Sequence, residues 1–341
     1  MRFDVVTSSH PNHDHCNWNC PFDNDLIISK FEREGWEKAV TYDLSTDSLK
    51  NLVSHGSGDL LIISALDQHQ FRDDGARFAY DIRPHLGSLR LRYKRVILNT
   101  VEPIYSHLAK FDCEENGSPD VRRAAHETFS RILSPDLVIY NCRIDVAKSP
   151  FNSIYVSNGD VSLRSKEPMA WEDREDVLVF SGRGSVRNRP LHGSRGDLIN
   201  NRRANLNFIK SIARKKNYSY IHINNSKTLQ ELYDVACRSK FEIQPRCGYN
   251  LHGLRVMTAM LCGSIPIIFK QSDELYHYYN DILIESETCF IVEGLKELDK
   301  EKLIKKIANR RLCADISKRI VKVAEAYCAK YNLERAAKYF L

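Results

Sequence analysis

The chain alternates short apolar runs with segments in which apolar residues recur at helical spacing. Continuous apolar runs are typical of parallel strands that are buried on both faces. In the first part of the chain they predict strands at residues 3–7, 40–44, 59–64, 95–99 and 137–140. Helical spacing between these runs predicts helices at residues 26–34, 46–53, 71–82 and 119–133. Strands that alternate with helices predict a parallel sheet that is covered on both faces.

The alternation stops at residues 157–176, where the sequence is polar and lacks periodicity, as in a crossover between domains. A second series then predicts strands at residues 177–180, 218–223, 241–243, 265–269 and 289–292. The helices of this series are expected at residues 198–215, 229–238 and 254–261, and over most of 303–339. We therefore expect two doubly wound α/β domains, residues 1–160 and 176–315, followed by a C-terminal helix at 316–341.

Residues 239–269 form a strand, a loop and a helix that together predict an anion site. The strand ends at Pro245, a polar and aromatic loop reaches Gly253, and the helical pattern stops at Gly263. The first N–H groups of a helix have no partner within the helix, and the helix dipole favours an anion there. Because Arg246 and Arg255 flank this opening, we expect it to bind a diphosphate.

A second basic loop, Ser181-Gly-Arg-Gly-Ser-Val-Arg187, follows the first strand of the same domain. Its glycines let the backbone approach a ligand, and Arg183 and Arg187 add positive charge. Ligands of such sheets bind beyond the carboxyl ends of the strands. We expect this loop to hold the same diphosphate, with a solvated basic loop as the alternative.

The 239–269 stretch resembles the donor-domain signature of the exostosin-like glycosyltransferases, which runs Ser-Lys-Phe, Pro-Arg-Gly, Arg-x-x-Glu-Ala and Gly-x-x-Pro-Val-Ile. The matching residues are Ser239, Lys240, Phe241, Pro245, Arg246, Arg255, Ala259, Gly263, Pro266 and Ile268. Two features depart from the signature: Cys247 separates Arg246 from Gly248, and Thr258 replaces the acidic residue that binds the donor ribose in related enzymes. The likeness covers about residues 176–295.

The resemblance implies the GT-B fold, in which two Rossmann-like domains face each other across a cleft. It also implies that the C-terminal helix, residues 316–341, crosses back to the first domain. It also implies an inverting hexosyl- or pentosyltransferase that moves a sugar from a nucleotide donor, a UDP-sugar, to a hydroxyl of a glycan acceptor. No cofactor and no divalent metal are expected to be essential. The residues that we expect at the donor are Arg183, Arg187, Arg246, Tyr249, His252, Gly253, Arg255 and Thr258.

Two segments of the first domain offer a catalytic base. Glu102 follows the fourth predicted strand, where a carboxylate can deprotonate an acceptor hydroxyl, although an ion pair or a helix start would also explain it. The loop after the first strand contains His10, His13, Asp14 and His15. Asp14 and His15 are further candidates for the base. No distant residue completes a metal-ligand pattern with this loop, so we expect no metal site.

Composition narrows the remaining classes of function. The 341 residues suit two domains, and the formal net charge of +6 comes without a long basic run or basic aromatic patches, so we expect no nucleic-acid partner. No segment has the roughly 20 apolar residues of a membrane helix, and the start does not resemble a signal peptide. The ten cysteines are scattered, as buried free thiols are. We expect a cytoplasmic protein.

Three alternatives stay open. One is a fucosyltransferase-like GT-B enzyme that uses a GDP-sugar. Another is a carbohydrate- or nucleotide-binding protein that kept the fold and lost activity, which Thr258 favours. The third is a basic nucleic-acid binder. The sequence does not indicate the sugar, the acceptor or the oligomeric state.

Overall fold

The computed structural model describes residues 1–6, 24–43, 46–64, 82–100, 105, 119–157, 159–164, 166–181, 194–223, 229–245, 254–270 and 278–341. The chain forms two compact units. Unit 1 comprises Met1–Ser157 and Tyr331–Leu341, and unit 2 comprises Asn158–Lys330. The return to unit 1 therefore involves Tyr331–Leu341, whereas the sequence suggested the whole of residues 316–341.

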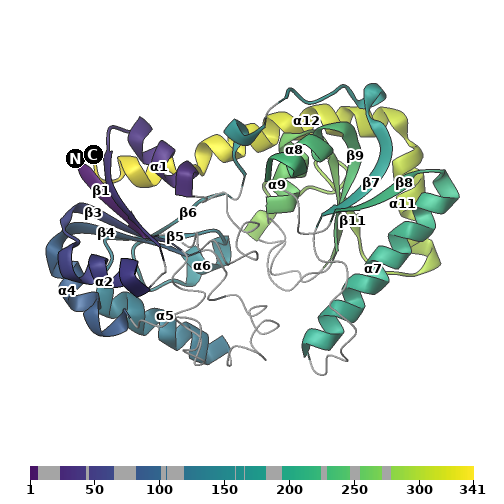
Figure 1. The fold of residues 1–341 in the computed structure, drawn as a ribbon. Coiled ribbons are helices and arrows are strands. Elements are labelled where there is room, and N and C mark those ends of the chain that lie inside the picture. Colours follow the sequence, from purple (N-terminus) through teal and green to yellow (C-terminus); the bar gives the residue numbers. More distant parts are fainter. Residues whose placement is uncertain are drawn as a thin grey trace. The chain divides into compact units, whose positions relative to one another are not determined.

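Unit 1 contains a six-stranded sheet in which all neighbouring strands are parallel (Figure 1). Its strands are β1 (Arg2–Val6), β2 (Glu37–Tyr42), β3 (Gly58–Ser64), β4 (Tyr93–Thr100), β5 (Leu137–Tyr140) and β6 (Ser153–Tyr155). Their order in space is β2-β1-β3-β4-β5-β6. The chain direction across the sheet reverses between β1 and β3, which is the topological switch point of a doubly wound sheet.

Helices cover both faces of this sheet. They are α1 (Asn24–Arg33), α2 (Thr46–His55), η1 (Arg83–His85), α4 (Leu86–Arg92), α5 (Pro119–Leu133), α6 (Arg143–Lys148) and α13 (Glu334–Lys338). Successive strand residues point to opposite faces. Leu61 and Leu98 pack in one hydrophobic cluster with α2, α4 and α5, whereas Ile62 and Ile97 pack in another with α1 and α13.

Unit 2 repeats the same topology with five parallel strands (Figure 1). Its strands are β7 (Glu175–Ser181), β8 (Ser219–Ile223), β9 (Ser239–Gln244), β10 (Ile265–Phe269) and β11 (Phe290–Val292), in the order β11-β10-β9-β7-β8. Its helices are η3 (Val161–Leu163), η4 (Trp171–Asp173), α7 (Ser194–Lys216), α8 (Leu229–Arg238), α9 (Leu254–Leu261), α11 (Glu297–Ala308) and α12 (Arg310–Lys330). The switch point of this sheet lies between β7 and β9.

The apolar pattern predicts most of these elements. Residues 119–133, 137–140, 229–238 and 265–269 form helices and strands with the expected bounds. The short elements α4, α6 and β6 were not predicted. The two helices are shorter than two turns and the strand has three residues, so their sequences show little periodicity. Of the helix expected at 71–82, all but Ile82 lies outside the described residues.

The described cysteines are buried free thiols, as predicted: Cys142, Cys237, Cys262, Cys289, Cys313 and Cys328. Within the described residues, no helix combines the length and the apolar character needed to cross a membrane.

Candidate functional site

Polar side chains gather at the carboxyl end of the second sheet, at its switch point. Ser181 is the last residue of β7, and Glu242 and Gln244 lie near the end of the adjacent strand β9. All three residues are buried. Buried polar groups need partners, and the switch point is where doubly wound sheets bind ligands. This part of unit 2 is therefore the candidate site.

Arg255, in the first turn of α9, joins the two strand ends. Its Nε donates hydrogen bonds to the carbonyl oxygen of Ser181 and to Ser181 Oγ, the latter at 3.2 Å. Its Nη1 donates to Gln244 Oε1 at 2.8 Å, and its guanidinium lies 5.0 Å from the ring centroid of Phe180. The Arg255 side chain is still 23% exposed. It thus presents a positioned positive charge at the edge of the sheet, as an anion site requires.

Glu242 is the acidic neighbour of this arginine. Its Oε1 accepts a hydrogen bond from Ser181 Oγ at 2.6 Å and lies 3.9 Å from Arg255 Nε. Burial raises the pKa of the Glu242 carboxyl to about 7, although the Ser181 hydrogen bond and the Arg255 charge oppose this shift. The carboxyl group therefore changes its charge near neutral pH.

Thr258 follows Arg255 by three residues on α9, and only 4% of its surface is exposed. The sequence predicts that it contacts the donor. That contact stays a prediction, because the loop from 246 to 253 lies outside the described residues.

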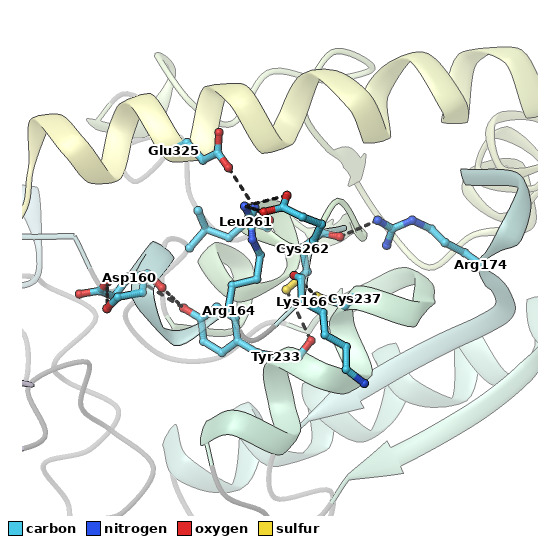
Figure 2. Close-up of polar contacts among 11 residues, drawn as sticks. Asp160, Arg164, Lys166, Arg174, Tyr233, Cys237, Leu261, Cys262 and Glu325 are labelled. Carbon is cyan, nitrogen blue, oxygen red and sulfur yellow. Dashed lines mark hydrogen bonds and ion pairs between the residues drawn. The ribbon is translucent and has the colours of Figure 1, made fainter. Parts of the chain in front are cut away.

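Two arginines hold the other end of α9 (Figure 2). Arg164 Nη1 donates to the carbonyl oxygen of Leu261 at 3.0 Å and to Glu325 Oε1 at 2.9 Å. Arg174 Nη2 donates to the carbonyl oxygen of Cys262 at 2.6 Å. The last carbonyls of a helix have no partner within it, and cations there are favourable. These contacts fix α9 and, through it, the position of Arg255.

Gly263 ends the helix, as the sequence predicts. Its φ of 74° lies in the left-handed region, which glycine adopts without steric cost. A Cβ atom at this position would lie 2.6 Å from Arg174 Nη2. The glycine therefore lets Arg174 approach the helix end.

In unit 1, side-chain hydrogen bonds hold residues before and after Glu102 in the sequence. Asn99, near the end of β4, is buried, and its Nδ2 donates to Ser64 Oγ at 2.9 Å. The backbone N–H of Tyr105 donates to Asp145 Oδ1 at 2.7 Å. Glu102 itself lies outside the described residues, so its role as a base stays a prediction.

Most of the predicted site residues lie outside the described residues, and their roles stay predictions. These are Asp14, His15, Glu102, Arg183, Arg187, Arg246, Tyr249, His252 and Gly253, with His10 and His13 of the first loop. Within the part of the chain that the structure describes, no group of His, Cys, Asp and Glu side chains is arranged to hold a metal ion.

Ser181, Glu242 and Gln244 are not among the predicted site residues, although Ser181 opens the predicted basic loop. A signal was present, because Glu242 and Gln244 alternate with Phe241 and Ile243 in a strand that is buried almost throughout. Acidic and amide side chains are rarely buried without a specific partner. In the structure, Ser181 and Arg255 are partners of Glu242, and Arg255 is a partner of Gln244.

The chain matches no protein-family model and no curated protein sequence. Solved structures match it over nearly its whole length. Sucrose-phosphate synthase from Thermosynechococcus elongatus has a TM-score of 0.60 at 10% identity, with 99% of this chain and 97% of that chain covered. Anabaena HepE in complex with UDP and glucose has a TM-score of 0.54 at 11% identity, with coverage of 99% and 98%.

An α-glucosyltransferase in complex with UDP is also similar, with a TM-score of 0.55 at 12% identity and coverage of 97% of this chain and 98% of that chain. At such low identity, these likenesses establish the fold alone. Together with the two parallel sheets and their flanking helices, they confirm the predicted fold class: the chain has the two-unit α/β GT-B fold.

Proposed function

We propose that the chain is a glycosyltransferase that moves a sugar from a UDP-sugar to a hydroxyl of a glycan acceptor. The observation that carries this proposal is the position of Arg255 at the switch point of the second sheet, between Ser181 and Gln244. Doubly wound sheets bind their ligands at such a switch point, and we propose that the anion bound here is the diphosphate of the donor. HepE and the α-glucosyltransferase were each solved with UDP, which favours uracil as the base of the donor.

The donor site would be built from arginines and from the start of α9. Arg255 and the first N–H groups of the helix would contact the diphosphate, and their positive charge would stabilise the leaving phosphate. The other donor contacts that we propose come from the sequence alone: Arg183, Arg187, Arg246, Tyr249, His252, Gly253 and Thr258.

The transfer would be a single displacement. A base takes the proton of the acceptor hydroxyl, the hydroxyl oxygen forms a bond to the anomeric carbon, and the bond from that carbon to the diphosphate oxygen breaks. UDP leaves with the electron pair, and the anomeric configuration inverts, as the exostosin resemblance implies. Glu102 is the first candidate for the base, ahead of Asp14 and His15. Because the proposed arginines would neutralise the diphosphate, we propose that no divalent metal is essential.

A screen of nucleotide sugars tests the proposal. The protein is incubated with UDP- and GDP-sugars, with and without a chelator, and release of the nucleotide is measured. We expect slow UDP release from at least one UDP-sugar, with no effect of the chelator. Release from GDP-sugars alone would favour the fucosyltransferase-like alternative, and UDP binding without turnover of any donor would favour an inactive protein. NMR of the transfer product then tests the inversion.

A further inference from the structure

Glu242 is a buried carboxyl group that the proposed reaction does not use. It lies in a strand between two others, and its surface is 4% exposed. Burying a carboxylate removes its hydration, which is unfavourable unless a hydrogen bond or an opposite charge compensates for the loss. Its contacts are with Ser181 and Arg255, which are the residues that define the candidate site.

Among the described residues, the groups that interact with Glu242 come from three elements. Strand β7 contributes the Ser181 hydroxyl, and α9 contributes the Arg255 guanidinium. Strand β8 contributes Tyr220, whose pKa is raised to about 12 by burial and then by the charge of Glu242. On β10 the residue in register with Glu242 is Pro266, which carries no charge. Arg255 is therefore the cation that faces this carboxyl group.

The same arginine would serve two anions. When Glu242 is ionised, it neutralises part of the Arg255 charge and repels a second anion bound to Arg255. When Glu242 is protonated, this repulsion is absent and its carboxyl group no longer neutralises part of the Arg255 charge. Binding of a diphosphate thus favours protonation of Glu242, and by reciprocity protonation favours binding of the diphosphate.

We propose that Glu242 is a positioning residue of the donor site. Glu242 takes up a proton when the nucleotide-sugar diphosphate binds, and its charge controls how strongly Arg255 holds the diphosphate. This inference rests on the proposed function. It predicts that the donor binds more tightly at pH 6 than at pH 8, and that a proton is taken up when the donor binds at neutral pH.

Calorimetry with UDP-glucose tests the proposal. This probe is a diphosphate diester, so it does not itself titrate between pH 6 and pH 8. We expect the affinity of the wild type to fall about tenfold from pH 6 to pH 8, as a carboxylate roughly 8 Å from an anion would cause near a protein surface. Titrations in buffers of different ionisation enthalpy should show proton uptake at pH 7.

Glu242→Gln keeps the shape of the side chain and removes its charge. We expect the affinity of this variant for UDP-glucose to change with pH less than that of the wild type, and its proton uptake to be smaller; His252, also a predicted donor contact, accounts for any pH dependence that remains. Glu175→Gln is the matched control, since Glu175 lies at the other end of β7, half-exposed and 3.8 Å from Arg238. It should retain the pH dependence of the wild type.

Two further measurements do not need the Gln variant to bind ligand. Ser181→Ala removes a hydrogen bond to the ionised carboxyl, so the fall in affinity should move to higher pH. Without ligand, the folded state should retain the Glu242 proton up to higher pH than the unfolded state does. As pH rises from 4.5 to 7, the thermal midpoint of the wild type should therefore fall relative to that of Glu242→Gln.

Failure of the inference and failure of the proposed function are distinguishable. If the wild type binds UDP-glucose with an affinity independent of pH, the role of Glu242 is wrong and the proposed function stands. If Glu242→Gln keeps the pH dependence of the wild type, another group is responsible and the inference is also wrong. If the wild type binds neither UDP nor any UDP-sugar at any pH, both are wrong.

Discussion

Arg255 combines a structural and a proposed functional task in one side chain. Its Nε and Nη1 atoms hold the ends of β7 and β9 through Ser181 and Gln244, and its side chain is still partly exposed. Guanidinium groups carry five N–H donors in a fixed plane, so one arginine can contact protein acceptors and a phosphate together. Its position is therefore determined by the fold before any ligand arrives.

Arg255→Ala should weaken UDP binding by roughly 1.5–3 kcal/mol, the scale of a lost charge-assisted hydrogen bond. Calorimetric titration with UDP measures the loss. Arg214→Ala is the control, because Arg214 is an exposed arginine on α7 of the same unit and its removal lowers the net charge equally. Unchanged affinity in the Arg255 variant would remove this residue from the donor site.

Only some of these residues and their contacts could be predicted from the sequence. Arg255 could be predicted because it follows a strand and a polar and aromatic loop and lies at the start of a helix. Glu242 and Ser181 could not be paired from the sequence, since 61 positions separate them and only the pairing of β7 with β9 brings them together. The catalytic base depends on loops outside the described residues, so Glu102 stays a prediction.

At the scale of elements, α9 is an eight-residue helix whose far end is held by buried side chains. Arg174 is the main anchor. It is 4% exposed, and it donates to the carbonyl oxygens of Met169, Ser239 and Cys262 at 3.0, 3.2 and 2.6 Å. One guanidinium thus links the segment before β7, the start of β9 and the end of α9.

Arg174→Met should lower the free energy of unfolding by at least roughly 1–3 kcal/mol, the cost of leaving one buried polar group without a partner. Urea denaturation of the variant measures the change. Arg238→Met is the matched control, because Arg238 is half-exposed and pairs with Glu175 at the surface, where such a pair contributes little. Equal effects of the two substitutions would show that Arg174 is not the anchor.

Element prediction succeeded where burial on both faces produces an unbroken apolar run, as in β10, or where a helix is long enough to show its period, as in α5. It failed for β6, in which Ser153–Tyr155 pairs only with β5 at the sheet edge. Edge strands are half-solvated, so their residues do not stand out from a loop.

At the scale of the whole molecule, two sheets repeat one strand order. In each unit the second strand lies outside the first and the third lies inside it, so each sheet has its switch point between its first and third strands. Alternating strands and helices in the sequence predict such sheets, but they do not determine where the chain returns to unit 1. That return rests on Leu333, Ala336, Ala337 and Phe340, which join the core cluster of Phe3 and Val5.

The central claim is that a nucleotide diphosphate binds at the switch point of unit 2. Hydrogen exchange followed by mass spectrometry, with and without saturating UDP, tests it most directly. We predict that UDP slows exchange in peptides that contain the ends of β7 and β9 and the first turn of α9, including Ser181, Gln244 and Arg255. Protection confined to unit 1, or no protection anywhere at saturating UDP, would contradict the account.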